Sequence, residues 1–141
     1  MDKKRFVLCG AYLLLASVLL CGCATGAKGP DDRTLIMNTM NGWKAGLIEK
    51  NIESVMAAYS ESFRDQEGRG KAEVRDFIQG AINEGYLDGI TIDLDVAQVT
   101  INDVEATVSP IPVTGGQGGV SLSMLLKKEN GAWLIVGTNE V

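Results

Sequence analysis

The apolar residues of this 141-residue chain change their spacing once, near Gly89, and that change constrains the fold more than any other feature. Before Gly89 they recur every three to four residues, the period of an amphipathic helix. After it they alternate with polar residues, the period of a strand with one buried face. No strand pattern lies between the helices, so the strand-helix-strand units of a parallel sheet are not expected. The sequence predicts an α+β domain with helices first and an antiparallel meander after them.

Three helices are predicted ahead of this change. The first spans residues 32–49 and begins at Asp31, whose side chain can accept free N–H groups of the first turn. A second, shorter helix is capped by Asn51 and ends near Ser60, and the third ends at Gly85, a common helix stop. The apolar residues at helical spacing are Ile36, Met40, Trp43 and Leu47, then Ile52, Val55, Met56 and Tyr59, then Val74, Phe77, Ile78, Ala81 and Ile82.

The strand region starts with one long run, residues 90–101, in which alternate residues are apolar. Apolar residues occupy even positions up to Val96 and odd positions from Ala97 onward. Such a change of phase within one run is typical of a β-bulge or a sharply coiled strand. We therefore expect a single irregular strand, whose even-numbered apolar residues as far as Val96 share one face.

Three further strands are predicted, over residues 104–113, 120–128 and 132–138. Tight turns at Asn102-Asp103 and Asn130-Gly131 precede the first and the last of them. Pro110 and Pro112 exclude a regular central ladder near the end of the first strand, because proline has no N–H to donate. Residues 115–119, four of them glycine, are expected to form a flexible loop tip.

The N-terminal segment has the features of a bacterial lipoprotein signal. Basic residues 3–5 precede an apolar stretch over residues 6–20 and the sequence Leu20-Cys21-Gly22-Cys23. This sequence resembles the lipobox, in which a leucine and a small residue precede the cysteine that takes a diacylglycerol; Cys21 is unusual at the middle position. An uncleaved anchor helix is the alternative, but fifteen apolar residues fall short of the roughly 20 that cross a bilayer. We predict lipidation at Cys23.

Cleavage before Cys23 divides the chain into three parts. These are a signal peptide, residues 1–22, a lipidated cysteine with a tether, residues 23–31, and one domain, residues 32–141. The acyl chains then hold the domain in the cell envelope, outside the cytoplasm. Ala24 is not the aspartate that favours inner-membrane retention in enteric-type bacteria. Where the source has two membranes, the expected location is therefore the outer membrane, facing the periplasm.

The charge of the exported chain excludes one class of partner. Without residues 1–22 it has 17 acidic and 10 basic residues, a net charge of −7. Nucleic-acid binding needs a clustered positive face that replaces the counterions of the phosphates, so no nucleic-acid partner is expected. Electrostatic docking on anionic lipid is unfavourable for the same reason. The lipid anchor is the expected contact with the membrane.

Two residue types that carry much of enzyme chemistry are missing from the predicted mature chain. Histidine does not occur in the sequence, which excludes histidine-based triads and histidine-ligated zinc or haem. Cys9 and Cys21 leave with the signal and Cys23 is acylated, so no thiol remains for a disulfide or a soft metal. We expect no metal and no cofactor.

Four segments occur in an order that resembles a known superfamily. They are Trp43 in the first helix, residues 51–59 (NIESVMAAY), residues 70–78 (GKAEVRDFI) and residues 128–136 (KENGAWLIV). Across residues 32–141 the set is similar to the nuclear transport factor 2-like (NTF2-like), or SnoaL-like, superfamily. The resemblance implies a cone in which three helices pack on a strongly curved antiparallel sheet around an apolar cavity. It implies no chemistry, because the superfamily includes isomerases, dehydratases, binding proteins and dimerisation domains.

Six large side chains are the candidates for lining such a cavity: Trp43, Tyr59, Phe63, Phe77, Met124 and Trp133. A lining of this kind suits an apolar or amphipathic ligand with one polar end. Plain core packing is the alternative, because aromatic residues at helical spacing usually belong to the core. We predict a lipid-anchored, non-catalytic domain that binds a small apolar ligand or an envelope protein through its cone.

The competing prediction is an enzyme of the isomerase or dehydratase type. Asp93 and Asp95 share one face of their predicted strand and could support acid–base catalysis, although a solvated strand face explains them more simply. With Asp93 facing inward, Tyr59 or Tyr86 would be the hydrogen-bond donor. The family resemblance implies such a pairing, since ketosteroid isomerase uses a carboxylate base with acidic donors. A site of the scytalone dehydratase type needs histidine and is excluded.

Two surface features are also predicted. Asp65 and Glu67 lie beside Arg64 and Arg69 in the sequence and are expected to form surface ion pairs of little energetic weight. The serines of residues 121–123 alternate with apolar neighbours. They either face solvent or belong to the outer sheet surface through which members of the superfamily dimerise, so a homodimer is a further expectation.

Overall fold

The computed structural model of the chain describes residues 29–141. The predicted signal peptide, residues 1–22, and the predicted lipidation site, Cys23, lie outside the described residues, as does most of the tether. The buried core residues all lie between Ile36 and Ile135. Within the described part, no helix combines the length and the apolar character needed to cross a membrane.

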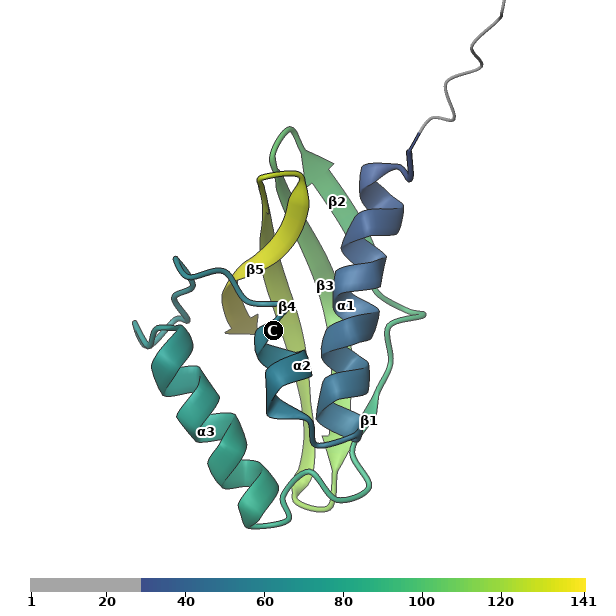
Figure 1. Cartoon of the computed structure of the whole chain (residues 1–141). Coiled ribbons are helices and arrows are strands. Elements are labelled where there is room, and N and C mark those ends of the chain that lie inside the picture. The colour runs from purple at the N-terminus through teal and green to yellow at the C-terminus, as the bar shows by residue number, and fades with distance from the viewer. Residues whose placement is uncertain (1–28) are drawn as a thin grey trace, which may run out of the picture.

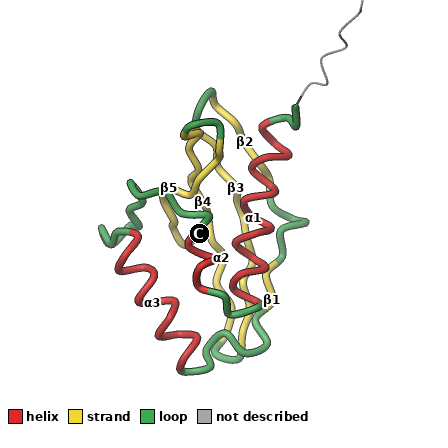
Figure 2. The backbone as a smooth tube through the Cα atoms, in the orientation of Figure 1, coloured by secondary structure: helices red, strands yellow, loops and turns green. Residues whose placement is uncertain are grey.

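Three helices precede five strands along the chain (Figures 1 and 2). The helices are α1 (Asp32–Ile48), α2 (Ile52–Met56) and α3 (Lys71–Asn83). The strands are β1 (Thr91–Ile92), β2 (Gln98–Asn102), β3 (Glu105–Gly115), β4 (Gly118–Glu129) and β5 (Ala132–Glu140). In Figure 1, α1 and α2 lie in front of the antiparallel sheet, and α3 stands to the side of α2. The predicted α+β class, with helices first, is confirmed.

α1 forms as predicted because its cap and its buried side are encoded locally. The Asp31 carboxylate accepts the Thr34 N–H at 2.8 Å and caps the first turn. The predicted apolar stripe is buried in full: Ile36, Met40, Trp43 and Leu47. Gly46 lets α2 approach closely, since a Cβ on this residue would lie 2.8 Å from the backbone nitrogen of Val55. The two helices therefore touch through their backbones.

α2 begins after its cap Asn51, as predicted, but ends at Met56 rather than near Ser60. The backbone beyond Met56 pairs with β5 instead. The Ser60 N–H donates to the Ile135 carbonyl at 2.9 Å, and the Ile135 N–H donates to the Ala58 carbonyl at 2.8 Å. The helix ends early because this pairing takes up backbone groups that a longer helix would need.

α3 begins and ends at signals that the sequence carries. The Gly70 N–H donates to the Glu73 carboxylate at 3.0 Å, which satisfies one free N–H at the helix start. Gly85 follows the helix with a φ of +76°, a left-handed conformation that glycine adopts without a steric penalty. Val74 and Ile78 are buried. The helix thus presents one apolar side to the rest of the domain.

β1 and β2 both pair with the same side of β3, so the sheet order is β1 and β2, then β3, β4 and β5. The prediction of one continuous strand over residues 90–101 is therefore wrong. The Asp93 carboxylate accepts the Asp95 N–H at 2.9 Å, a local bond that turns the chain between the two strands. The turn leaves Val96, which was expected to share the buried face, 50% exposed.

β3 is an interior strand, and it is irregular at the position that its prolines predict. Its register with β4 shifts next to Pro110. The residues Gly116-Gln117 join β3 to β4, so the predicted loop over residues 115–119 is a shorter turn. Asn130 and Gly131 connect β4 to β5 with φ of +50° and +83°, the left-handed values of a two-residue hairpin turn, as predicted.

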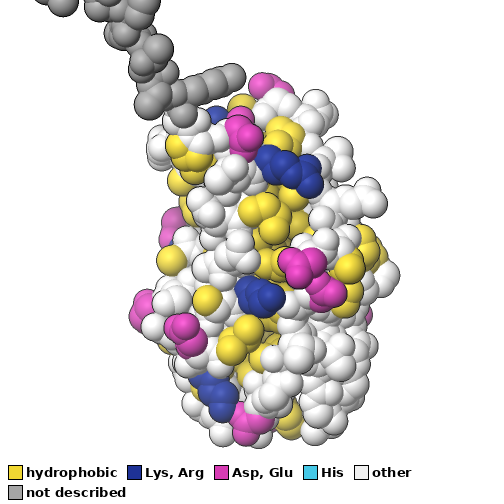
Figure 3. All heavy atoms as spheres, turned by 90° about the vertical axis from the view of Figure 1, so that its right-hand side faces the viewer, with side chains coloured by type: hydrophobic (Ala, Val, Ile, Leu, Met, Phe, Trp, Pro, Cys, Tyr) yellow, Lys and Arg dark blue, Asp and Glu magenta, His cyan; other side chains and the backbone are white. Residues whose placement is uncertain are grey.

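The core lies between the helices and one face of the sheet. Its largest fully buried apolar side chains come from helices, loops and strands alike: Trp133, Phe63, Ile36, Met40, Ile111, Met124, Leu126 and Ile135. On the side of the molecule seen in Figure 3, acidic and basic side chains are scattered among hydrophobic ones. This face carries no extended patch of one charge.

Candidate ligand-binding cavity

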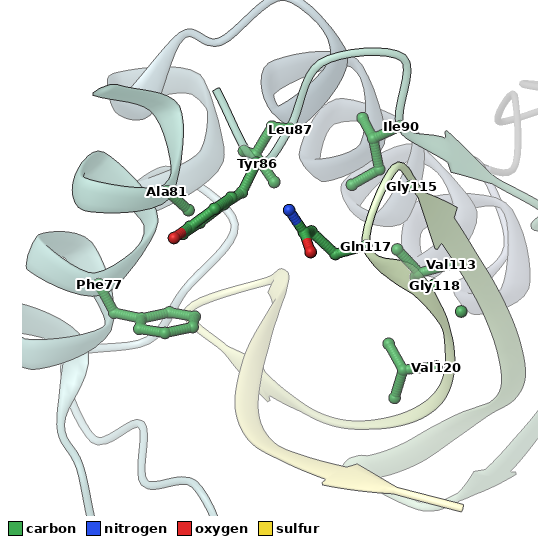
Figure 4. A pocket seen from close by; sticks show the side chains of 11 residues that line it. Phe77, Ala81, Tyr86, Leu87, Ile90, Val113, Gly115, Gln117, Gly118 and Val120 are labelled. Carbon is green, nitrogen blue, oxygen red and sulfur yellow. The ribbon is translucent and has the colours of Figure 1, made fainter. Parts of the chain in front are cut away.

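A cavity lies between α3 and the strands β3 and β4, and it has two adjoining lobes. The inner lobe, of about 350 Å³, extends toward α1 and the end of β5. The outer lobe, of about 590 Å³, is bordered by the β3–β4 turn (Figure 4). Four residues line both lobes and mark the junction between them: Phe77, Leu87, Val113 and Val120.

Two polar groups lie among the apolar side chains of the inner lobe, the hydroxyl of Tyr59 and the indole N–H of Trp43. The Trp43 indole Nε1 donates to this hydroxyl at 3.2 Å. Tyr59 is 5% exposed, and burial raises the pKa of its hydroxyl to about 12, against the opposing effect of the Trp43 hydrogen bond. Among residues 29–141 no acceptor takes the hydroxyl's own proton. The group is therefore free to donate to a bound oxygen atom.

The inner lobe has a polar mouth made by two segments far apart in the sequence. One is the loop before α3, which supplies Asp65, Gln66 and Arg69, and the other is the end of β5, which supplies residues 138–140. The Arg69 guanidinium lies over the Phe77 ring, 5.2 Å from its centre. The mouth thus has charged groups directly beside an aromatic wall.

Asp65 is held tightly within this mouth. Its Oδ2 accepts the Arg69 Nε–H at 2.7 Å, and its Oδ1 accepts the backbone N–H groups of Glu67 at 3.0 Å and Arg69 at 2.8 Å. Burial alone would raise the pKa of the carboxyl, but the hydrogen bonds to its charged form outweigh burial and lower it. The Asp65 side chain is only 7% exposed while that of Arg69 is 40% exposed, so the expected surface ion pair has a buried carboxylate and an exposed guanidinium.

The remaining charges of this loop behave differently from Asp65. Arg69 also pairs with the exposed carboxylate of Glu67 at 3.1 Å, as predicted. Arg64 does not join these pairs, because its guanidinium donates to the Phe63 carbonyl instead. Arg69 therefore pairs with both carboxylates of this loop, and it lines the inner lobe together with Asp65 and Gln66.

The outer lobe is lined by aromatic, aliphatic and glycine residues and by one amide. Figure 4 shows Phe77, Tyr86 and Gln117 projecting into the space between α3 and the β3–β4 turn. The described residues that line this lobe include no charged side chain. Phe77 is 61% exposed and Tyr86 is 52% exposed, so large apolar surface borders the opening.

Solved structures share the fold of this chain. A protein of unknown function with a cystatin-like fold from Nostoc punctiforme aligns with a TM-score of 0.64, at 20% identity over 77% of this chain and 89% of its own. An NTF2-like protein of unknown function from Shewanella oneidensis gives 0.60, at 12% identity over 77% and 97%. A protein from Shewanella frigidimarina, named as a candidate ketosteroid isomerase, gives 0.63, at 22% identity over 76% and 94%.

The fold is NTF2-like. No protein-family model and no curated protein sequence matches the chain. At the identities of these structures the shared property is the fold, and one fold can carry many unrelated functions.

Four of the six side chains predicted to line the NTF2-like cavity meet in the inner lobe: Trp43, Tyr59, Phe77 and Met124. The other two lie elsewhere. Phe63 is buried with its ring edge against Tyr59, the centroids 4.9 Å apart. Trp133 donates through Nε1 to Asp32 at 3.0 Å, near the start of α1. Phe63 and Trp133 therefore match the alternative of plain core packing.

Asp93, the weak catalytic candidate, lines neither lobe. It is exposed on the turn between β1 and β2, where it caps the Asp95 N–H. Tyr59 and Tyr86, its predicted partners, lie in the inner and the outer lobe respectively. The structure does not bring Asp93 together with either tyrosine.

The polar mouth was missed by the sequence analysis. The spacing of Asp65 and Arg69, four residues apart, indicated an ion pair but not its place beside Phe77. Nothing in the sequence places residues 138–140 next to that loop. The described residues hold no cluster of His, Cys, Asp or Glu with the spacing of a metal site.

Proposed function

We propose that this chain is a lipid-anchored binding protein of the cell envelope. Its NTF2-like cone takes a small, neutral, amphipathic ligand and does not transform it. The observation that supports this most directly is the buried Tyr59 hydroxyl, a free donor in the apolar part of the inner lobe. Apolar walls with a few convergent polar groups are typical of small-molecule sites.

The chemistry of the lobe favours a neutral ligand. A carbonyl, hydroxyl or ether oxygen can accept the Tyr59 proton while the rest of the molecule contacts Leu47, Ile78 and Met124. A carboxylate at the same depth would lose its hydration without gaining a free cation, which makes its burial costly. Asp65 and Glu140 at the mouth repel an anion further, since Arg69 is already paired with Asp65.

Binding explains the cavity better than catalysis. The Asp65 carboxylate accepts three N–H groups and its pKa is lowered, so it is a weak base at neutral pH. Asp93 lies outside the cavity. A proton transfer between a tyrosine and Asp93, the arrangement of the competing enzyme prediction, has no counterpart in this geometry.

The location follows from the sequence. Residues 1–22 direct export, and Cys23 takes the acyl chains that hold the protein on the membrane. Residues 24–31 then connect the anchor to α1. In a source with two membranes, the domain faces the periplasm from the outer membrane.

Calorimetric titration tests the binding proposal. The protein is a chain that starts at Ala24 and keeps every core residue, and the ligands are 2-octanone, 1-octanol and octanoate. We expect the two neutral compounds to bind and octanoate to bind at least about tenfold more weakly. Tyr59→Phe should weaken 2-octanone binding by about 2- to 10-fold, the value of one hydrogen bond. Tyr86→Phe is the matched control and should change it little. Equal binding of octanoate, or no binding of any of the three, contradicts the proposal.

A further inference from the structure

The junction between the two lobes has one exposed side and one side that the sheet fixes. Val113 and Val120 are paired opposite each other on neighbouring strands β3 and β4, so their positions are fixed by the sheet. Phe77 reaches the junction from α3 and is 61% exposed. A side chain with that much exposed surface can change its rotamer without disturbing the core.

The Phe77 ring is nevertheless held from one side. The Arg69 guanidinium lies over it at 5.2 Å from the ring centre, within the range of a cation–π contact. Arg69 is itself fixed by Asp65 at 2.7 Å and Glu67 at 3.1 Å. The loop before α3 therefore sets the position of the ring at the junction.

We propose that Phe77 determines the length of the ligand by separating the inner lobe from the outer one, and that Arg69 is the positioning residue for its ring. This inference rests on the proposed binding function. Short neutral amphiphiles fill the inner lobe with their oxygen on Tyr59. Longer ones must pass between Phe77 and the Val113–Val120 pair to place their chain end in the outer lobe.

The proposal predicts that, in a series of ketones of increasing length, the gain in affinity per methylene drops at one chain length. We call this length the break. Each added methylene that is buried contributes about 0.8 kcal/mol, a gain in affinity of about fourfold. From 2-hexanone to 2-tetradecanone, the affinity for the unmodified domain should rise by this factor per methylene until the inner lobe is full. Beyond that length the gain per methylene should fall to less than about twofold.

Two substitutions should move the break. Phe77→Ala opens the junction, so the fourfold gain should continue to longer ketones. Arg69→Met releases the ring and should shift the break in the same direction. Arg69→Lys keeps the cation, so its break should lie where it does in the unmodified domain. Tyr86→Ala truncates a side chain that lines the outer lobe and not the inner one, and it should leave the break in place. Phe77 and Tyr86 are exposed, so neither change threatens folding.

The outcomes separate this inference from the binding function itself. Binding of the short ketones with the same break in Phe77→Ala as in the unmodified domain overturns the role of Phe77 and leaves the binding function standing. An equal shift in Tyr86→Ala overturns it as well. Failure of every ketone to bind any of these proteins overturns both proposals.

Discussion

The indole Nε1 of Trp43 donates a 3.2 Å hydrogen bond to the hydroxyl oxygen of Tyr59, which joins α1 to the segment after α2 within the inner lobe. The bond fixes the Tyr59 oxygen while leaving its proton unused among residues 29–141. A donor held in this way loses little freedom when a ligand arrives, which favours binding. The Trp43–Tyr59 pair thus presents an oriented donor to the inner lobe.

The buried Tyr59 predicts a loss of stability in alkali. Its pKa is about 12 in the folded chain and 10 when exposed, so between these values the unfolded chain releases a proton that the folded chain keeps. The contribution of Tyr59 to the free energy of unfolding is fully present below pH 10. It is lost as the pH rises toward 12, by about 2 to 3 kcal/mol in total. Urea unfolding between pH 8 and 12 measures it. The slope should largely vanish in Tyr59→Phe and persist in Tyr86→Phe.

Asp65 predicts a loss of stability in acid. Its pKa is lowered in the folded chain, so its contribution is complete above the ordinary value of 3.8 and declines as the pH falls through the folded value. Asp65→Asn should cost about 2 kcal/mol at pH 7, because it weakens a nearly buried set of hydrogen bonds to a charged group. Glu67→Gln, at an exposed partner of the same arginine, should cost less than about 0.5 kcal/mol. Equal losses would contradict this account.

The contact of α1 with α2 predicts opposite effects at two glycines of one helix. A Cβ at position 46 would lie 2.8 Å from the Val55 nitrogen, so Gly46→Ala should destabilise the domain by about 2 kcal/mol. A Cβ at position 42 meets nothing within 4 Å, so Gly42→Ala should stabilise it by about 0.5 to 1 kcal/mol through helix propensity. Thermal unfolding measures both. Two changes of the same sign would show that α1 and α2 are not packed this closely.

The lipidation proposal predicts which cysteine carries the acyl chains. Cys23→Ser should abolish incorporation of labelled palmitate and move the protein from the membrane fraction to the soluble or precursor fraction. Cys21→Ser should change neither result, because Leu20 would be a poor residue directly before a cleavage site. Labelling that survives in Cys23→Ser but not in Cys21→Ser would show that Cys21 carries the acyl chains and would contradict the lipidation proposal.

The sequence predicts the fold well where the determinants are local. The stripe from Ile36 to Leu47, the Asn51 cap and the Asn130-Gly131 turn each depend on residues close together in the chain. The break between β1 and β2 is less predictable, because alternation alone does not reveal that Asp93 caps a turn.

The candidate cavity is predictable only in part, for a related reason. Helical spacing places Trp43, Tyr59 and Phe77 each on the apolar side of its own predicted helix, and the structure brings all three together in the inner lobe. The same reasoning cannot separate them from Trp133, whose partner Asp32 is far away in the sequence. The polar mouth depends on the meeting of the Asp65 loop with the end of β5, which tertiary packing alone determines.

The most direct test of the binding function is to locate 2-octanone on the domain by nuclear Overhauser contacts from the unlabelled ligand to the isotope-labelled protein. The account predicts contacts to the Met124 methyl group and the Tyr59 ring, with the ketone carbon chain toward Met124 and its oxygen toward the hydroxyl. Contacts confined to surface side chains such as Leu125, or none at all at saturating ketone, would contradict the claim that the cone is a ligand-binding site.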